Sequence, residues 1–257
     1  MESLDNGCLP WWYNRSLGHD QSCPHGSLLP FDITIPDEMS TLQAVSLFYS
    51  CLPIILLLAS GLYCLCVRRS HSLAMFCFPL ACLAMNELVL KKLVMMPRPG
   101  ATGKLSDDTG RHVGSCALSC GMPSSHSMLS IGSLVLLVLD AGLRVVPRQA
   151  DAYESMDAGQ SCIFFAPRGT WTPKQFIMYM AFWVVMLLPV PLARVILYDH
   201  STSQIVVGSG LGALLALLWF AAWEKSLCLC RLRLGSKVFG GCMFHDYLSA
   251  MEAAGSA

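Results

Sequence analysis

Five long apolar runs constrain this chain more than any other feature of its sequence. They cover about residues 42–66, 72–96, 127–146, 176–198 and 205–223, and each is near the ~20 residues that a helix needs to cross a bilayer. The alternative, a large soluble protein with buried helices, would leave too little polar surface to cover them. Charged residues make up only 13% of the chain, about half the share in soluble domains. The sequence therefore predicts an all-α membrane protein with about five transmembrane helices.

Polar segments at both ends divide the chain into three parts. Residues 1–40 are rich in Gly, Pro, Asn and Asp, and their start lacks the basic and apolar regions of a cleaved signal peptide. We expect this N-terminal segment to precede a transmembrane domain at 41–224 and a tail at 225–257. The polar loop 147–175 and the tail carry no chemical signature that indicates a function.

The distribution of charge predicts how the chain crosses the membrane. Five crossings place residues 67–71, 147–175 and 224–257 on one side, and these segments with their flanks hold ten of the 17 Lys and Arg residues. The positive-inside rule therefore places the C-terminus in the cytosol and residues 1–40 in a lumen. The glycosylation sequon that begins at Asn14 lies on the lumenal side. Because basic and acidic residues balance overall, net charge does not indicate a nucleic acid as partner.

Five of the 13 cysteines lie inside the apolar runs, where they are typical small buried side chains: Cys51, Cys64, Cys66, Cys77 and Cys82. Cys228-x-Cys230 has no matching second pair, so the cysteines form no zinc pattern. Four others lie in polar segments: Cys8, Cys23, Cys116 and Cys120. They could form disulfides in an oxidising lumen, but the sequence does not decide which of them pair.

Polar residues gather in three places at the ends of the apolar runs, all on the predicted lumenal side. Residues 91–99 read KKLVMMPRP, residues 121–126 read GMPSSH, and residues 194–204 read RVILYDHSTSQ. A single Lys or Arg at a helix end usually reaches toward the lipid headgroups, and a lone His in a loop usually has no chemical role. A functional site is therefore indicated by the ordered set on one face of the membrane: Lys-x6-Arg-Pro, Pro-Ser-x-His and Arg-x5-His.

Together the three segments predict a site for a tetrahedral oxyanion. Lys91, Arg98 and Arg194 supply three fixed cations, and the arginines suit bidentate contacts with an oxyanion. Residues 124–126 open the third predicted helix, where free N–H groups and the dipole favour an anion. The two histidines provide one nucleophile and one acid, the pair needed for phosphoester cleavage through a covalent intermediate. No metal-ligand pattern accompanies them, so we expect no metal and no cofactor, and electrostatic stabilisation by the cations.

These segments resemble the signature of the type 2 phosphatidic acid phosphatase superfamily: K-x6-RP, PSGH and SR-x5-H-x3-D. The resemblance covers roughly residues 72–210 and implies a phosphatidic-acid-phosphatase-type bundle with five of its usual six helices. It implies that His200 attacks phosphorus to form a phosphohistidine, and that His126 protonates the leaving oxygen and then activates water. The residues that it implies hold the phosphate are Lys91, Arg98, Ser124, Ser125 and Arg194.

Three positions depart from that signature. Ser125 stands where the family has Gly, so its expected contribution is a backbone N–H, and Ala193 replaces a Ser. Gln204 replaces the Asp that orients the nucleophilic histidine. An amide can fix the tautomer of His200, but it stabilises an imidazolium less than a carboxylate does. On this ground alone the chain could be a weakened or inactive enzyme.

However, Gln204, the PSSH variant and Asn86-Glu87 together resemble the dolichyldiphosphatase branch, in which Gln at this position is usual. Glu87 lies one helical turn before Lys91. An acidic residue within a membrane helix is usually functional or paired, and we favour an ion pair that holds Lys91 over a direct role in catalysis.

The leading hypothesis is therefore a dolichyldiphosphatase-like enzyme in the endoplasmic reticulum membrane. It would hydrolyse a polyisoprenoid diphosphate, dolichyl diphosphate, to dolichyl phosphate and phosphate on the lumenal face, and so support recycling of the lipid carrier for N-glycosylation. Two alternatives stay open: a broad-specificity lipid phosphate phosphatase, and an inert membrane protein that binds lipid phosphates. The two intact histidines argue against an inert protein, because binding alone needs only the cations.

Overall fold

The computed structural model describes residues 8–13, 23–67, 70–102, 105–107, 110, 112–145, 162–163, 166–167 and 173–233 of the 257. The α-helices are α1 (Thr41–Val67), α2 (Ser70–Met85), α3 (Lys91–Val94), α4 (Ser125–Val145), α5 (Pro173–Leu187), α6 (Val190–Ile196) and α7 (Thr202–Arg233), with a π-helix, η2 (Asn86–Leu90), between α2 and α3. The strands are β1 (Gly26–Leu29), β2 (Ile33–Pro36), β3 (Leu105–Ser106), β4 (His112–Val113), β5 (Cys162–Ile163) and β6 (Ala166–Pro167). They form three two-stranded antiparallel hairpins.

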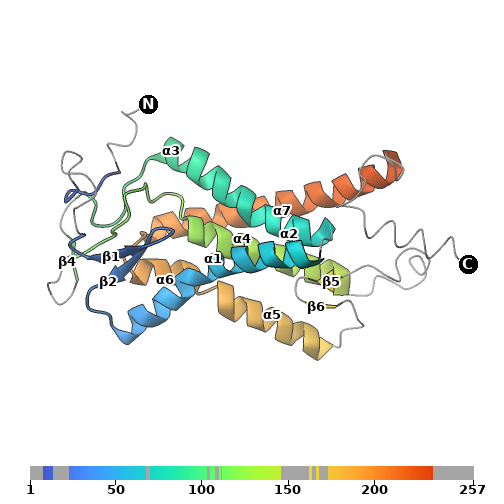
Figure 1. Ribbon diagram of the computed structural model, residues 1–257, viewed down its shortest axis with the longest axis horizontal. Coiled ribbons are helices and arrows are strands. Elements are labelled where there is room, and N and C mark those ends of the chain that lie inside the picture. The colour runs from blue at the N-terminus through green and yellow to red at the C-terminus, as the bar shows by residue number, and fades with distance from the viewer. Residues whose placement is uncertain are drawn as a thin grey trace, which may run out of the picture.

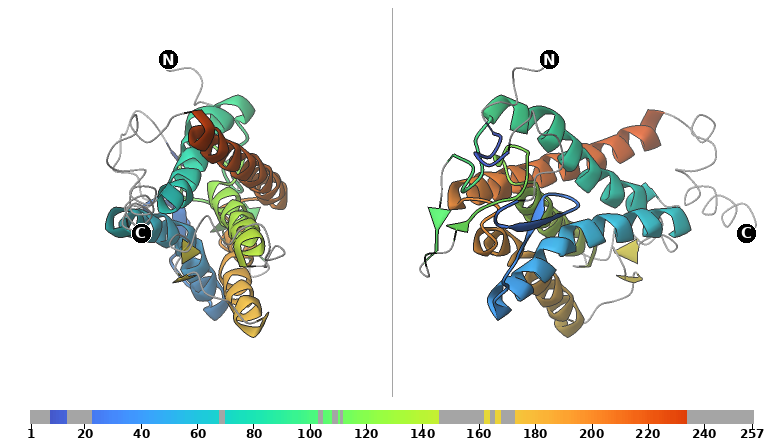
Figure 2. Two further views of the ribbon diagram at one scale, coloured as in Figure 1. Left: turned by 90° about the vertical axis from the view of Figure 1, so that its right-hand side faces the viewer. Right: turned by 60° about the vertical axis from the view of Figure 1, so that its left-hand side comes forward.

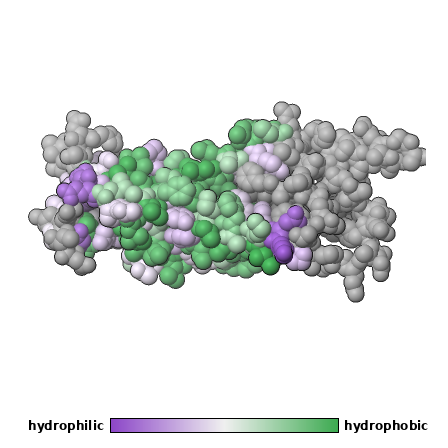
Figure 3. All heavy atoms as spheres, turned by 90° about the horizontal axis from the view of Figure 1, so that it is seen from below, coloured by the Kyte–Doolittle hydropathy of each residue, from purple (hydrophilic) through white to green (hydrophobic). Residues whose placement is uncertain are grey.

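Five helical segments of the described chain are long and apolar enough to cross a membrane, which confirms the predicted fold class. They are Thr41–Cys66, Ser72–Val94, Ser125–Gly142, Pro173–Ile196 and Thr202–Trp223. They run along the long axis of the molecule (Figure 1). Apolar side chains cover the middle of the face in Figure 3, with hydrophilic ones toward its two ends. This is the surface that a bilayer-spanning bundle requires.

Helix α4 is the central helix of the bundle. Of its most apolar stretch, 67% is buried inside the protein, against 17–33% for the other four spans. The end-on view shows α4 among α1, α2, α5 and α7 (Figure 2). The core around it includes the fully buried side chains of Phe78, Met128, Leu137 and Leu187.

Two glycines let α7 approach α4 closely. A Cβ at Gly208 would lie 2.6 Å from the carbonyl oxygen of Ser124, and one at Gly212 would lie 2.2 Å from that of Met128. Small residues at such crossings allow helix backbones to pack directly on each other in membranes. The contact at Gly208 fixes the start of α4 against the start of α7, where two of the three polar segments lie.

Two of the predicted membrane helices are interrupted, and both interruptions lie near the polar segments. The second span changes from α-helix to π-helix at Asn86, and its last turn ends at Met95, which has a left-handed φ of 44°. The fourth span breaks between α5 and α6 at Leu188 and Pro189, because a proline cannot donate the next helical hydrogen bond. Length and apolarity alone did not reveal these breaks.

The β1–β2 hairpin lies at the same end of the bundle as α6 and the end of α3 (Figure 1). Two disulfides tie the N-terminal segment to the loop before α4: Cys8–Cys120 and Cys23–Cys116. The four cysteines that the sequence placed in polar segments are therefore all paired, in a pattern that the sequence left open. The Asn14 sequon, most of the loop 147–175 and the tail from residue 234 lie outside the described residues.

Candidate active site

Lys91 is positioned by the π-helix at the end of the second span. The N–H of Lys91 donates to the carbonyl of Asn86, five residues earlier, and the side chain is almost fully buried. Its Nζ lies 2.7 Å from Glu87 Oε1, which is the ion pair expected from the sequence. A π-turn adds a residue to the helix without ending it and often marks a functional position.

Arg98 stands between two prolines in the loop that follows, and its guanidinium is held from several directions. Nε donates to the carbonyl of Ser119 at 3.0 Å and Nη2 to Ser119 Oγ at 2.9 Å. Nη1 lies 3.3 Å from the carbonyl of Asp199 and 3.3 Å from His200 Nε2. The loop before α4 and the loop after α6 therefore fix one cation beside the predicted nucleophile.

The start of α4 carries the serines and the first histidine. Ser125 Oγ donates to Glu87 Oε1 at 2.6 Å and accepts from Asn86 Nδ2 at 2.8 Å. Ser124 is different, since its N–H donates to the carbonyl of Gln204 and its hydroxyl interacts with Ser127. His126 is buried, and its Nε2 has no hydrogen-bond partner among the described residues.

Arg194 is fully buried at the end of α6 and is paired with a carboxylate. Its Nη1 lies 3.1 Å from Asp199 Oδ2, and both side chains are 0% exposed. Asp199 is itself held by Ser115 Oγ and by the N–H and hydroxyl of Thr34. Asp199 is next to His200 in the sequence, but its carboxylate orients Arg194. The Nε of Arg194 has no hydrogen-bond partner among the described residues.

Gln204 fixes the ring of His200. Its Oε1 accepts from the N–H of Ser201 at 3.1 Å and lies 3.2 Å from His200 Nδ1, while its Nε2 donates to the carbonyl of Pro97 at 2.8 Å. The two backbone partners assign the amide orientation, so Nδ1 must carry the proton that Oε1 accepts. The other nitrogen of His200, Nε2, is then unprotonated, and its lone pair accepts a hydrogen bond from Arg98 Nη1 in the absence of substrate.

The pKa of His200 lies well below the usual 6.5, because the ring is buried and because Arg98 and Arg194 disfavour a further positive charge. A neutral imidazole with a fixed tautomer can act as a nucleophile toward phosphorus.

A cavity of about 260 Å³ brings these groups together. The site residues that line it are Arg98, Ser125, His126 and His200. The carboxylates Asp32 and Glu87 line it as well. The remaining walls are apolar and come from α1, α2, α4 and the β1–β2 turn, through Phe31, Ile54, Leu57, Leu83 and Leu129. Lys91 and Arg194 do not line the cavity themselves, but both contact Asp32 at its edge. Ser124 is not among the lining residues. A cavity with cations on one side and apolar walls on the other suits an anionic headgroup on a lipid chain.

Asp32, from the turn of the β1–β2 hairpin, is a site residue that the sequence did not reveal. Its Oδ2 lies 2.8 Å from Arg98 Nη2 and 3.5 Å from Lys91 Nζ. Burial alone would raise the pKa of this carboxyl, but Arg98 and Lys91 outweigh burial and hold the pKa below its usual value. No motif links residue 32 to the cations, since its contacts form only in the folded chain.

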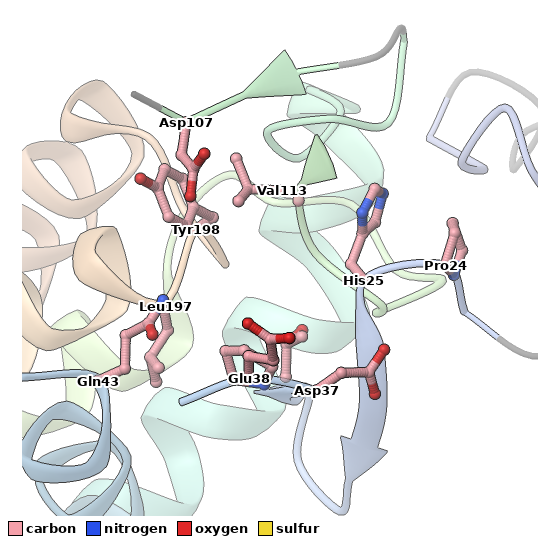
Figure 4. Close-up of a pocket in the computed structure, with 12 residues that line it drawn as sticks. Pro24, His25, Asp37, Glu38, Gln43, Asp107, Val113, Leu197 and Tyr198 are labelled. Carbon is pink, nitrogen blue, oxygen red and sulfur yellow. The ribbon is translucent and has the colours of Figure 1, made fainter. Parts of the chain in front are cut away.

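A second pocket, of about 360 Å³, lies beside the loop that carries His200. Figure 4 shows Asp107 next to Tyr198 on one side of it and Glu38 on the other. Its charged lining residues among the described part of the chain are carboxylates, together with His25. Such a lining does not suit a phosphate. In the described ranges no three His, Cys, Asp or Glu side chains are grouped to hold a metal ion.

Comparison with known families agrees with this geometry. The model of the PAP2 superfamily matches residues 72–228, which include all eight predicted site residues. No curated protein and no solved structure matches the chain. Since the matched region is more than half of the sequence, the chain belongs to the PAP2 superfamily, whose membrane-embedded members are phosphatases of lipid phosphates.

Proposed function

We propose that this membrane phosphatase hydrolyses dolichyl diphosphate or a closely similar polyisoprenoid diphosphate, releasing phosphate and leaving the lipid monophosphate. One observation carries the proposal: His200 is oriented by the neutral amide of Gln204 within a cavity that joins fixed cations to apolar walls. In the proposed complex Arg98, Arg194 and Lys91 hold the terminal phosphate, with the N–H of Ser125. Two buried nitrogen atoms, Arg194 Nε and His126 Nε2, have no hydrogen-bond partner among the described residues and could contact the phosphate oxygens.

In the first step the lone pair on His200 Nε2 attacks the terminal phosphorus. The bond between phosphorus and the bridging oxygen breaks, and a phosphohistidine forms while the lipid monophosphate leaves. His126 gives its proton to the leaving oxygen. The cations stabilise the charge that develops on the equatorial phosphate oxygens, which is the main electrostatic contribution that phosphoryl transfer needs.

In the second step His126 takes a proton from a water molecule. The water oxygen attacks phosphorus, the bond to His200 Nε2 breaks, and inorganic phosphate is released. His126 lines the same cavity as His200, which supports its use as acid in one step and base in the other.

Gln204 supports a preference for diphosphates over monophosphates. A carboxylate at this position would stabilise the positive charge that develops on His200, and an amide adds no charge. The phosphohistidine is then less stabilised, and the reaction depends more on the leaving group. A diphosphate expels a lipid monophosphate, whereas a monophosphate expels a much poorer alkoxide leaving group.

The test is phosphate release by the purified protein from a short-chain isoprenyl diphosphate and from the monophosphate of the same lipid. We expect a marked preference for the diphosphate in kcat/KM. His200→Ala should abolish turnover, while His245→Ala, in the tail beyond the matched region, should leave it unchanged. Equal rates on both lipids would indicate a broad lipid phosphate phosphatase, and no release with intact binding would indicate an inert lipid-binding protein.

We also propose that the site faces the lumen of the endoplasmic reticulum. The charge distribution supports this orientation, and so do the disulfides Cys8–Cys120 and Cys23–Cys116 near the site, since disulfides persist in oxidising compartments. In cells with only the plasma membrane opened, a tag after Ala257 should be reached from the cytosol, and a tag near residue 105 should not. The reverse pattern would place the site in the cytosol.

A further inference from the structure

The turn of the β1–β2 hairpin places residue 32 among the three cations of the candidate site. Asp32 Oδ2 accepts from Arg98 Nη2 at 2.8 Å and from Ser119 Oγ at 2.5 Å. The same oxygen lies 3.5 Å from Lys91 Nζ. The backbone carbonyl of Asp32 accepts from Arg194 Nη2 at 2.5 Å. A carboxylate therefore uses donors that a phosphate in this site would also use.

The hairpin is shaped to deliver this carboxylate. Phe31 and Asp32 both adopt left-handed φ angles, 67° and 61°, at the turn between β1 and β2. Behind the turn, Thr34 is bonded to Asp199 through its N–H and hydroxyl, and Cys23 is bridged to Cys116. The base of the hairpin is thus fixed, whereas the side chain of Asp32 at its tip is 30% exposed.

Each cation of the site is paired with a carboxylate, but the three pairs differ. Glu87, which pairs with Lys91, is also bonded by Ser125, and Asp199, which pairs with Arg194, is held by Thr34 and Ser115. Among the described residues, the hydrogen bonds and ion pairs of the Asp32 carboxylate run to the cation cluster and to Ser119, which also holds Arg98. Asp32 is therefore the carboxylate that an incoming oxyanion can replace without disturbing the scaffold.

We propose that Asp32 is an internal anion that competes with phosphate for the cation site and selects lipid-borne phosphates over free ones. The inference rests on the proposed function, in which these cations bind phosphate. A free phosphate ion has only its own charge with which to displace the carboxylate. A lipid diphosphate also gains apolar contact with the cavity walls at Ile54, Leu57 and Leu83. After hydrolysis the return of Asp32 helps the product phosphate to leave.

The test is Asp32→Asn, which removes the charge and suits the left-handed turn, because Asn adopts that conformation readily. If the carboxylate blocks the site in about 90–99% of free molecules, the variant should bind inorganic phosphate about ten- to a hundredfold more tightly. Inhibition of turnover by phosphate should strengthen in proportion, with a smaller fall in KM for isoprenyl diphosphate. Asp37→Asn, an exposed carboxylate of the same segment, is the matched control and should change neither quantity. Unchanged or weaker phosphate binding in Asp32→Asn would overturn the inference, because a residue that merely positions Arg98 should weaken binding when it loses its charge.

A second variant and a measurement on the unaltered protein guard against misfolding. Asp32→Gly removes the side chain in a turn that glycine tolerates and should tighten phosphate binding at least as much. In the unaltered protein, vanadate should speed hydrogen exchange at the amides of residues 31–33, and unchanged or slower exchange would contradict displacement of the turn. If the variants bind phosphate more tightly while no isoprenyl diphosphate is cleaved, the proposed function fails and competition by Asp32 stands. If isoprenyl diphosphate is cleaved while phosphate binding is unaltered in the variants, the proposed function stands and competition by Asp32 fails.

Discussion

Removing the side chain of Gln204 should slow catalysis much more than it weakens substrate binding. In Gln204→Ala, His200 Nδ1 loses the acceptor at 3.2 Å that fixes its tautomer and ring orientation. A buried polar group left without its partner costs about 1–3 kcal/mol. If the transition state bears that whole cost, kcat falls roughly 5- to 150-fold, since each 1.36 kcal/mol is a factor of ten. KM should change little, because Gln204 does not line the cavity.

The assay is steady-state phosphate release from an isoprenyl diphosphate in detergent. Gln43→Ala is the matched control: Gln43 accepts hydrogen bonds from the N–H and hydroxyl of Ser40 at the start of α1 and does not line the cavity of the site. Gln204→Glu keeps an acceptor for His200 and adds charge, but it loses the donor to the carbonyl of Pro97. It should retain more activity than the alanine variant and raise the relative rate on monophosphates. Wild-type kcat in Gln204→Ala would refute the role assigned to this amide.

Three further predictions follow from the paired charges and the buried ring. Asp199→Asn leaves the guanidinium of Arg194 buried without its counter-charge, which should cost up to about 3–5 kcal/mol of stability; a thermal midpoint no lower than that of Asp37→Asn would contradict the pairing. Because the folded-state pKa of His200 is depressed, below pH 6.5 the unfolded chain takes up a proton that the folded chain does not. The free energy of unfolding should therefore decrease as pH is lowered below 6.5. The acid limb of kcat/KM that reports His200 should lie below pH 6.5, and a limb above that value would count against a neutral nucleophile. Activity should survive EDTA and be inhibited by vanadate, which resembles the transition state of phosphoryl transfer; strict dependence on Mg²⁺ would show that the cations are not sufficient.

The membrane spans and the cation site could be predicted because each has a local signature. Apolar length specifies a span, and the three polar segments carry fixed spacings that the fold brings to one end of the bundle. The role of Asp32 had no such signature: it meets Arg98 across 66 positions of sequence through a hairpin in a polar segment. Nor did the cysteines specify their partners, since four cysteines allow three pairings. The residue roles in catalysis stay predictions until the variants are measured.

The disulfide pattern also sets the order in which this protein can be completed. Cys8 and Cys120 are separated by 112 positions, and the first two membrane spans lie between them. At ordinary rates of translation, about 5–20 residues per second, the Cys8 thiol waits roughly 6–22 s for its partner to be synthesised. Both spans must also be inserted before the two sulfurs can meet. The Cys8–Cys120 bridge therefore forms only after the second span is in place, and oxidation of Cys8 before Cys120 is available would join it to a wrong cysteine.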